Sequence, residues 1–279
     1  MKINYLVYTS DLTKYPLVKK YKSSGIETIS ACDPRSALYI ATGIAAKQND
    51  CVLVIVNSSN ESRSAFSGMT EAYYRNLPII LLTIGQHLDY NIEIADVAKT
   101  HYVIDNYQDL EELEFNQFPA HVELKDDSYT VKAKQSCHKL ENCLSQTLNA
   151  NHYLYFSNRI DTAGYDYQCK VVNGGLPNCY EGTIANVLGA SLAKMHSRYI
   201  AVMTEKELML DINTLGNINM NNSLLLIVLS NDEKDLIMNV PKSIDFKTYT
   251  IRENDLVKDF LVKVINNNRK SILRIIKES

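Results

Sequence analysis

Val52-Leu53-Val54-Ile55-Val56 is an unbroken apolar run in a chain of 279 residues. A strand that helices cover on both faces carries such a run, whereas a strand with one wet face alternates apolar and polar residues. A second run, Ile79-Ile80-Leu81-Leu82-Thr83, follows a helical pattern at Gly68–Tyr74. Strand and helix patterns in alternation predict a parallel sheet of the α/β class.

The alternation continues along most of the chain in two stretches. The strands predicted in the first are Ile3–Tyr8, Glu27–Ala31, Val52–Val56, Ile79–Thr83, His101–Ile104 and His121–Leu124, with helices at Tyr15–Ser23, Arg35–Lys47 and Gly68–Tyr74. The strands predicted in the second are Tyr153–Phe156, Tyr199–Met203, Leu224–Leu229, Thr248–Ile251 and Ser271–Ile276, with helices at Cys137–Leu148, Glu181–His196, Leu208–Asn219 and Asp255–Asn267. We expect two parallel-sheet domains, 1–125 and 151–279, joined by a linker and helix at 126–150.

Composition and charge exclude several classes of protein. With 46% hydrophobic and 22% charged residues the chain has the content of a globular protein, and its net charge of −3 gives no electrostatic reason for nucleic acid or an anionic membrane as partner. No apolar run reaches the roughly 18–20 residues that span a bilayer. The N-terminus has the pattern of a first strand rather than of a signal peptide, so a cytoplasmic location is expected.

Cysteine and histidine motifs give no sign of a metal centre. The six cysteines contain no C-x-x-C pair, which favours reduced structural thiols over a zinc site. The six histidines are scattered and form neither H-E-x-x-H nor H-x-H.

Three segments of the first half carry a family resemblance. They are Asp33-Pro34-Arg35-Ser36, the polar stretch Asn57–Arg63, predicted as a loop, and Glu71–Thr83. They resemble the D-E-R-S segment, the T-S-G loop and the E-A-Y-x-x-x-x-P-L-I-V-L-T stretch of the thiamine-diphosphate enzymes. The likeness is greatest to the acetolactate synthase group and the menaquinone-pathway carboligase.

The second half is similar to the diphosphate-binding domain of that family. Val172-Asn173-Gly174-Gly175 and Gly182–Ala193 resemble its glycine-containing turn and its G-A-x-x-A helix. Thr204-Glu205-Lys206 stands where the family has G-D-G, and Asn231-Asp232 stands where it has N-N.

The resemblance implies a minimal two-domain member with two six-stranded α/β domains and a homodimer or a larger even assembly. It implies thiamine diphosphate and Mg²⁺ as cofactors. The positions that would contact the cofactor are Arg35, Ser58, Ser59, Asn60, Thr204, Lys206 and Asn231, and those that would bind the metal are Glu205 and Asp232.

The departures from the family pattern bear on the chemistry. Pro34 occupies the position of the glutamate that starts thiamine chemistry, and proline has no titratable group, so the catalytic residue stays unassigned. Proline also suits the first turn of the helix predicted after it. Side chains at Thr204 and Lys206 hinder the approach of a diphosphate. Glu205 could replace the aspartate ligand or be an ordinary acid at a helix start.

Two functions stay open from the sequence. The first is a relative of the 2-oxo-acid decarboxylases and carboligases whose cofactor site is degenerate, acting on another small ligand or as a partner subunit of an intact thiamine enzyme. The alternative is an active lyase or transferase that uses thiamine diphosphate and Mg²⁺ on a 2-oxo acid through a proton route without glutamate.

Overall fold

The computed structural model describes residues 3–48, 50–57, 59–85, 94–126, 134–174, 182–193, 195–216, 223–231, 238–267 and 269–277, with the side chains of 59–62 left out. The chain divides into two compact units, residues 1–132 and 133–279. None of the helices in the described part has the length and apolarity that a bilayer crossing requires.

The first unit is built on a six-stranded parallel sheet in the order β2-β1-β3-β4-β6-β5. Its strands are β1 (Ile3–Thr9), β2 (Glu27–Ala31), β3 (Cys51–Asn57), β4 (Ile79–Ile84), β5 (Thr100–Ile104) and β6 (Ala120–Leu124). Its helices are α1 (Pro16–Ser23), α2 (Pro34–Gln48) and α3 (Ser59–Arg75), with 3₁₀ turns η1 (Ser10–Lys14), η2 (Ile94–Val97) and η3 (Tyr107–Glu111).

The second unit is also built on a six-stranded parallel sheet, in the order β11-β12-β10-β9-β7-β8. Its strands are β7 (His152–Phe156), β8 (Lys170–Asn173), β9 (Arg198–Thr204), β10 (Leu224–Ser230), β11 (Lys247–Arg252) and β12 (Ser271–Ile276). Its helices are α4 (His138–Ser145), α5 (Thr183–Leu192), α6 (Glu205–Leu210), α7 (Asn239–Ser243) and α8 (Lys258–Ile265), with 3₁₀ turns η4 (Ile212–Gly216) and η6 (Glu253–Asp255).

The two sheets share one topology. When the strands of each unit are numbered from its own first strand, both sheets have the order 2-1-3-4-6-5. The predicted fold class is therefore confirmed, since both halves are parallel α/β sheets of six strands. Six strands per domain is also what the family resemblance implies.

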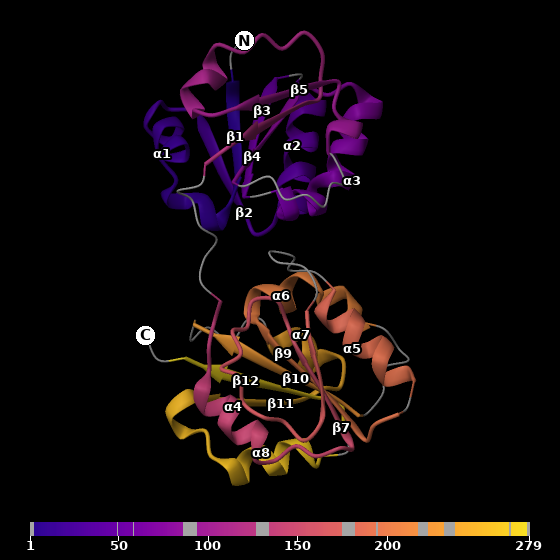
Figure 1. Cartoon of the computed structure of the whole chain (residues 1–279). Helices are drawn as coiled ribbons and strands as arrows, with labels where there is room; N and C mark the ends of the chain where they lie inside the picture. The colour runs from indigo at the N-terminus through magenta and orange to yellow at the C-terminus, as the bar shows by residue number, and fades with distance from the viewer. Residues whose placement is uncertain are drawn as a thin grey trace. The chain divides into compact units, whose positions relative to one another are not determined.

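Helices cover both faces of each sheet, so each unit has three layers (Figure 1). In the first unit α1 packs on one face, and α2 and α3 pack on the other. In the second unit α4 and α8 cover one face, and α5 and α6 cover the other. Every residue of the central strands β3, β4, β9 and β10 is buried, which explains their continuous apolar sequences.

Two local predictions were wrong, and a third was wrong in part. The stretch 57–63 is not a loop, because α3 begins at Ser59. Its first turns are polar, and the apolar stripe that reveals a helix starts only at Ala65. The predicted helix at Leu208–Asn219 instead begins at Glu205, ends at Leu210 and is followed by η4, with residues 217–222 outside the described part.

The glycine-containing turn expected at Val172–Gly175 was wrong for its first two residues, which belong to β8, a strand of four residues at the edge of the second sheet. Gly175 lies outside the described residues. Gly174 follows β8 directly, and a Cβ there would lie 2.7 Å from Oδ1 of Asn158. This glycine therefore serves a close approach of two chain segments after β7 and β8.

Substitution of Gly68 tests the packing of α2 against α3. A Cβ at Gly68 would lie 2.5 Å from Cβ of Leu38, so we expect Gly68→Ala to lower the free energy of unfolding by roughly 1–2 kcal/mol. The matched control is Gly43→Ala in α2, where nothing lies within 4 Å. Alanine favours a helix over glycine, so the control should gain about 0.5–1 kcal/mol. Urea unfolding measures both values, and a Gly68→Ala protein as stable as the control would contradict this packing.

Candidate functional site

The segment that carries Pro34 is a helix start. Pro34 is the first residue of α2 and is buried. The Asp33 carboxylate caps this helix, because its Oδ1 accepts the backbone N–H of Ser36 at 2.9 Å and its Oδ2 accepts the Ser36 hydroxyl at 2.6 Å. Arg35 is half-buried in the same turn. Burial raises the pKa of Asp33, but these hydrogen bonds together outweigh it, and the net pKa is lowered.

The next predicted position follows β3. Ser58 lies outside the described residues, and Ser59 and Asn60 form the first turn of α3 with side chains that are not described. After β1 the chain continues to β2, which lies toward one edge of the sheet, and after β3 it continues to β4, which lies toward the other edge. A parallel sheet binds ligands at such a switch point, beyond the carboxyl ends of its strands.

Two buried polar side chains lie at this switch point. Thr9 ends β1 and Asn57 ends β3, and they are 0% and 2% exposed. Within the described residues, Thr9 Oγ1 and Asn57 Oδ1 have no hydrogen-bond partner. Since buried polar atoms are nearly always satisfied, this edge of the first sheet is suited to a polar group from elsewhere.

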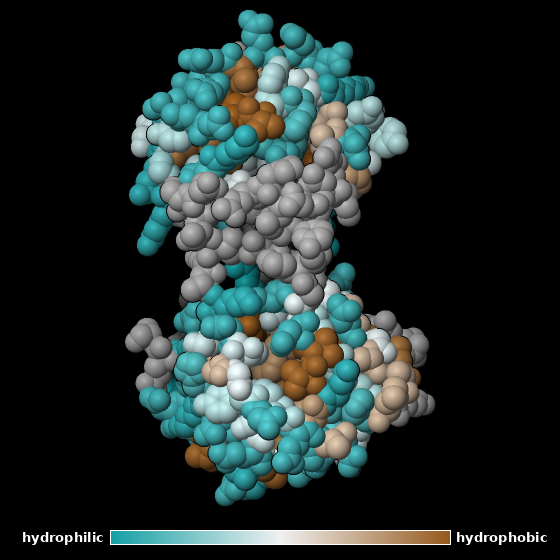
Figure 2. Space-filling model, viewed as in Figure 1, coloured by the Kyte–Doolittle hydropathy of each residue, from teal (hydrophilic) through white to brown (hydrophobic). Residues whose placement is uncertain are grey.

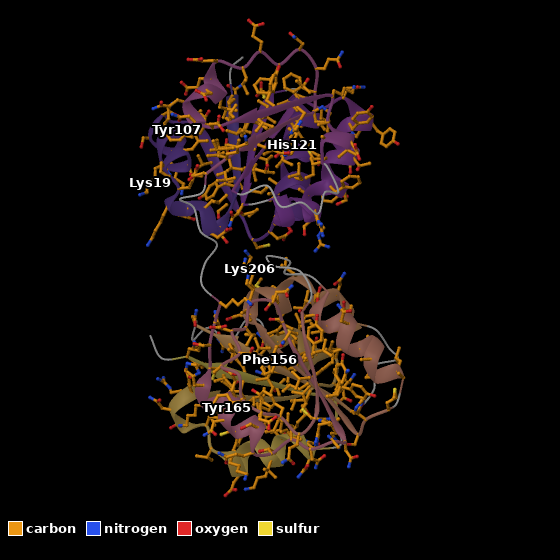
Figure 3. The ribbon with its side chains drawn as sticks, viewed as in Figure 1. Lys19, Tyr107, His121, Phe156, Tyr165 and Lys206 are labelled. Atoms are coloured by element: carbon orange, nitrogen blue, oxygen red, sulfur yellow. The ribbon has the colours of Figure 1, made fainter. Side chains whose placement is uncertain are left out.

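The second sheet brings four predicted residues to one edge. Thr204 ends β9 and pairs in register with Leu229 of β10, so Glu205, Lys206 and Asn231 follow at the carboxyl ends of two neighbouring strands. Figure 3 shows Lys206 where β9 runs into α6. The predicted partner Asp232 lies outside the described residues. This edge is also the switch point of the second sheet, between β7 and β9.

Thr204 and Glu207 form a capping box at the start of α6. Glu207 Oε2 accepts the backbone N–H of Thr204 and the Thr204 hydroxyl, each at 2.8 Å. It also accepts the hydroxyl of Ser157, at the end of β7, at 2.7 Å. One buried carboxylate oxygen thus joins two neighbouring strand ends.

Burial has the largest effect on the pKa of this carboxyl group. Glu207 is 0% exposed, and burial raises its pKa. The hydrogen bonds from Thr204 and Ser157 and the charge of Arg159 lower the pKa but do not outweigh burial. The net pKa of Glu207 is therefore raised above its usual value.

A second series of hydrogen bonds holds the Glu205 side chain. Its carboxylate accepts the hydroxyl of Ser230, which ends β10. The same hydroxyl accepts a hydrogen bond of 3.1 Å from Nη2 of Arg274, a side chain that is 1% exposed. The Glu205 carboxylate is therefore already engaged by the protein.

This edge does not suit a diphosphate bound through Mg²⁺. A diphosphate needs backbone N–H groups, close backbone approach and positive charge. Here the N–H of Thr204 donates to Glu207, and the first turn of α6 carries two carboxylates. Lys206 supplies positive charge in that turn, but Thr204 and Lys206 both carry side chains where the resemblance has glycine.

Sequence reasoning missed the residues that hold this edge together. Thr204-Glu205-Lys206-Glu207 has the T-x-x-E pattern of a capping box, so that part could have been read from the sequence. Ser157 and Arg274 carry no local signal, because only the sheet brings them to Glu207 and Ser230.

Comparisons with known proteins give likenesses in structure only. No protein-family model and no curated protein matches the chain. Among solved structures, the chain is similar to benzoylformate decarboxylase from Polynucleobacter necessarius, with 10% identity, a TM-score of 0.38 and coverage of 99% of this chain and 96% of that one. It is also similar to a protein from Mycobacterium smegmatis that has been proposed to be a thiamin diphosphate-dependent enzyme, with 9% identity, a TM-score of 0.39 and coverage of 99% of this chain and 97% of that one.

The raised pKa of Glu207 predicts a specific pH dependence of stability. Folded Glu207 binds its proton more tightly than the unfolded chain, whose glutamates titrate near ~4.3. The free energy of unfolding should therefore fall as pH rises from that value through the folded pKa. Glu207→Gln should lack this part of the dependence when urea unfolding is measured across the pH range.

Asp33→Asn is the control of opposite sign. The pKa of Asp33 is lowered, so its contribution is present above the unfolded value near ~3.9 and is lost as pH falls through the folded pKa. Asp33→Asn should remove that loss and leave the Glu207 effect in place. If the stability of the wild type and of Glu207→Gln depended on pH in the same way, the pKa of Glu207 would not be raised in the folded protein.

Proposed function

We propose that this chain is a divergent relative of the 2-oxo-acid decarboxylases and carboligases in which standard thiamine chemistry has been lost. The observation that carries the proposal is the capping box at the second sheet edge. There Glu207 takes up the backbone N–H of Thr204, a group that a diphosphate would need. Two carboxylates in the turn make the edge unfavourable for a polyanion.

The first domain supports the same proposal. Pro34 begins α2 and offers no group that could hold or move a proton. The neighbouring Asp33 carboxylate is committed to the helix cap through three hydrogen-bond donors, two from Ser36 and one from the Cys32 thiol. A proton route through this segment would therefore have to displace the cap.

We further propose that the chain acts as a subunit of an assembly. Large apolar side chains are exposed on α2 and α3, where Tyr39 is 44% and Tyr74 is 79% exposed. The second domain exposes Leu192, at 54%, and Met195, at 81%. Figure 2 shows hydrophobic groups amid a largely hydrophilic surface on both domains. A second copy of the chain in a homodimer or larger even assembly would cover such groups, as would an intact thiamine enzyme.

One observation favours the alternative of an active enzyme. Glu205, Lys206 and Asn231 lie together at the carboxyl edge of β9 and β10, where the resemblance places metal and diphosphate contacts. On that reading, Glu205 would replace the aspartate ligand of Mg²⁺ and Lys206 would face the diphosphate. A bound thiamine diphosphate would supply the carbanion chemistry, and Pro34 would still leave its proton transfer without a glutamate.

Calorimetry of the full chain with thiamine diphosphate and Mg²⁺ tests the proposal. We expect no saturable binding at micromolar concentrations, because the N–H donor is engaged and the edge is acidic. A double variant, Thr204→Gly with Lys206→Gly, tests whether restoring the two glycines of the resemblance restores binding.

Micromolar binding by the wild-type chain would contradict the loss of the cofactor. In that case turnover of pyruvate-like 2-oxo acids with Pro34 unchanged would establish the alternative. Absence of turnover across such donors would exclude it.

A further inference from the structure

A second group of chemically active side chains lies in the first domain, away from the edges described above. His101 lies on β5, and His121 and Glu123 lie on the neighbouring strand β6. One nitrogen or oxygen atom from each of the three lies within 4.8 Å of the others. Among the described residues, this is the one cluster in which three potential metal ligands lie close together.

The register of the two strands brings the three side chains to one face. His101 pairs with His121, and Val103 pairs with Glu123. Tyr102 and Val122 pack into the core on the side of α1. Since side chains alternate along a strand, His101, His121 and Glu123 point to the opposite face, the side of α3. Figure 3 shows His121 within the sheet of the first domain.

The side chains of the cluster contact one another and a residue of the next strand. His101 Nε2 lies 3.1 Å from Glu123 Oε1. The rings of His101 and His121 are stacked, with centroids 5.1 Å apart and planes 20° apart. His121 Nε2 lies 3.1 Å from the hydroxyl of Thr83 on β4. A hydroxyl on one ring nitrogen is the kind of outer contact that orients a metal-binding histidine.

The cluster is fixed on one side and open on the other. His121 is 4% exposed, which holds its ring in the sheet. The side chains of His101 and Glu123 are 35% and 20% exposed, and His101 lies on the edge strand. A solute can therefore reach the cluster from the side of β5.

We propose that His101, His121 and Glu123 form a Zn²⁺ site with an open coordination position. Imidazole and carboxylate are ligands that Zn²⁺ takes in proteins, and two histidines with one glutamate leave a fourth tetrahedral position to water or to a small ligand with an oxygen donor. This site uses none of the residues invoked for thiamine diphosphate, so it stands independently of the proposed function.

The distances fit a tetrahedral ion after a small movement. Ligands about 2.0–2.1 Å from zinc lie about 3.3 Å from one another in a tetrahedron. The pair His101–Glu123 already has that spacing, at 3.1 Å. The separations of His101 and Glu123 from His121, at most 4.8 Å, close when both partly exposed side chains rotate toward the buried His121 ring.

Zinc titration of the metal-stripped full chain against a chromophoric chelator tests the site. We expect one Zn²⁺ per chain in the wild type. His101→Ala and Glu123→Gln should each weaken binding by about tenfold or more, because each removes one of three ligands. These two side chains are partly exposed, so both variants should fold, which far-UV circular dichroism verifies. The control His138→Ala removes an exposed histidine at the start of α4 and should bind as the wild type does.

Cobalt distinguishes the proposed ligands from the cysteines. Co²⁺ bound by nitrogen and oxygen should show visible d–d bands without a thiolate charge-transfer band. Failure of the wild type to bind Zn²⁺ would overturn the proposal. Unchanged affinity in both His101→Ala and Glu123→Gln, or a thiolate band with Co²⁺, would also overturn it.

Discussion

The carboxylate of Glu207 is the group on which the edge of the second sheet depends. It is fully buried, and a single oxygen accepts hydrogen bonds from Ser157 and from both the backbone and the hydroxyl of Thr204. Burying a carboxylate without such donors would cost several kcal/mol of folding free energy. The three hydrogen bonds therefore make the burial of Glu207 possible. They also fix where β9 ends and α6 begins. This arrangement engages the backbone N–H of Thr204 and the hydroxyls of Thr204 and Ser157 from within the protein, while Glu207 Oε1 is buried without a hydrogen-bond partner among the described residues.

The same topology built twice gives the chain two carboxyl edges, and the two edges differ. In the first domain Thr9 and Asn57 leave buried oxygen atoms without a partner among the described residues. In the second domain Ser157, Thr204, Glu205 and Ser230 are joined in hydrogen bonds with one another or with neighbours. The two edges therefore differ in how many of their strand-end hydroxyl and backbone groups are bonded within the protein, although each also holds a buried oxygen atom without a partner among the described residues.

Elements with strong apolar patterns were predictable from the sequence. The central strands β3 and β10 are buried throughout, so their unbroken hydrophobic runs marked them within a residue or two. The start of α3 was not predictable in this way, because its first turns are polar. Strand β8 was missed because an edge strand of four residues, two exposed and two half-buried, has no long apolar run.

The candidate sites show where sequence reasoning stops. The family resemblance predicted a shared site for Thr204-Glu205-Lys206 and Asn231, and the sheet brings them to one edge. Their partners Ser157 and Arg274 could not be predicted, because they approach only through the sheet. His101 and His121 are likewise far apart in the sequence, and only the register of β5 with β6 puts them side by side. A site that is assembled by strand pairing leaves no short motif in the sequence.

The account depends most directly on the closed cap at the start of α6. A crystal structure grown with thiamine diphosphate and Mg²⁺ in excess tests it at the atoms concerned. We expect Glu207 Oε2 in contact with Thr204 and Ser157, and no diphosphate against α6. A diphosphate bound there, with the contacts between Thr204 and Glu207 opened, would contradict the account.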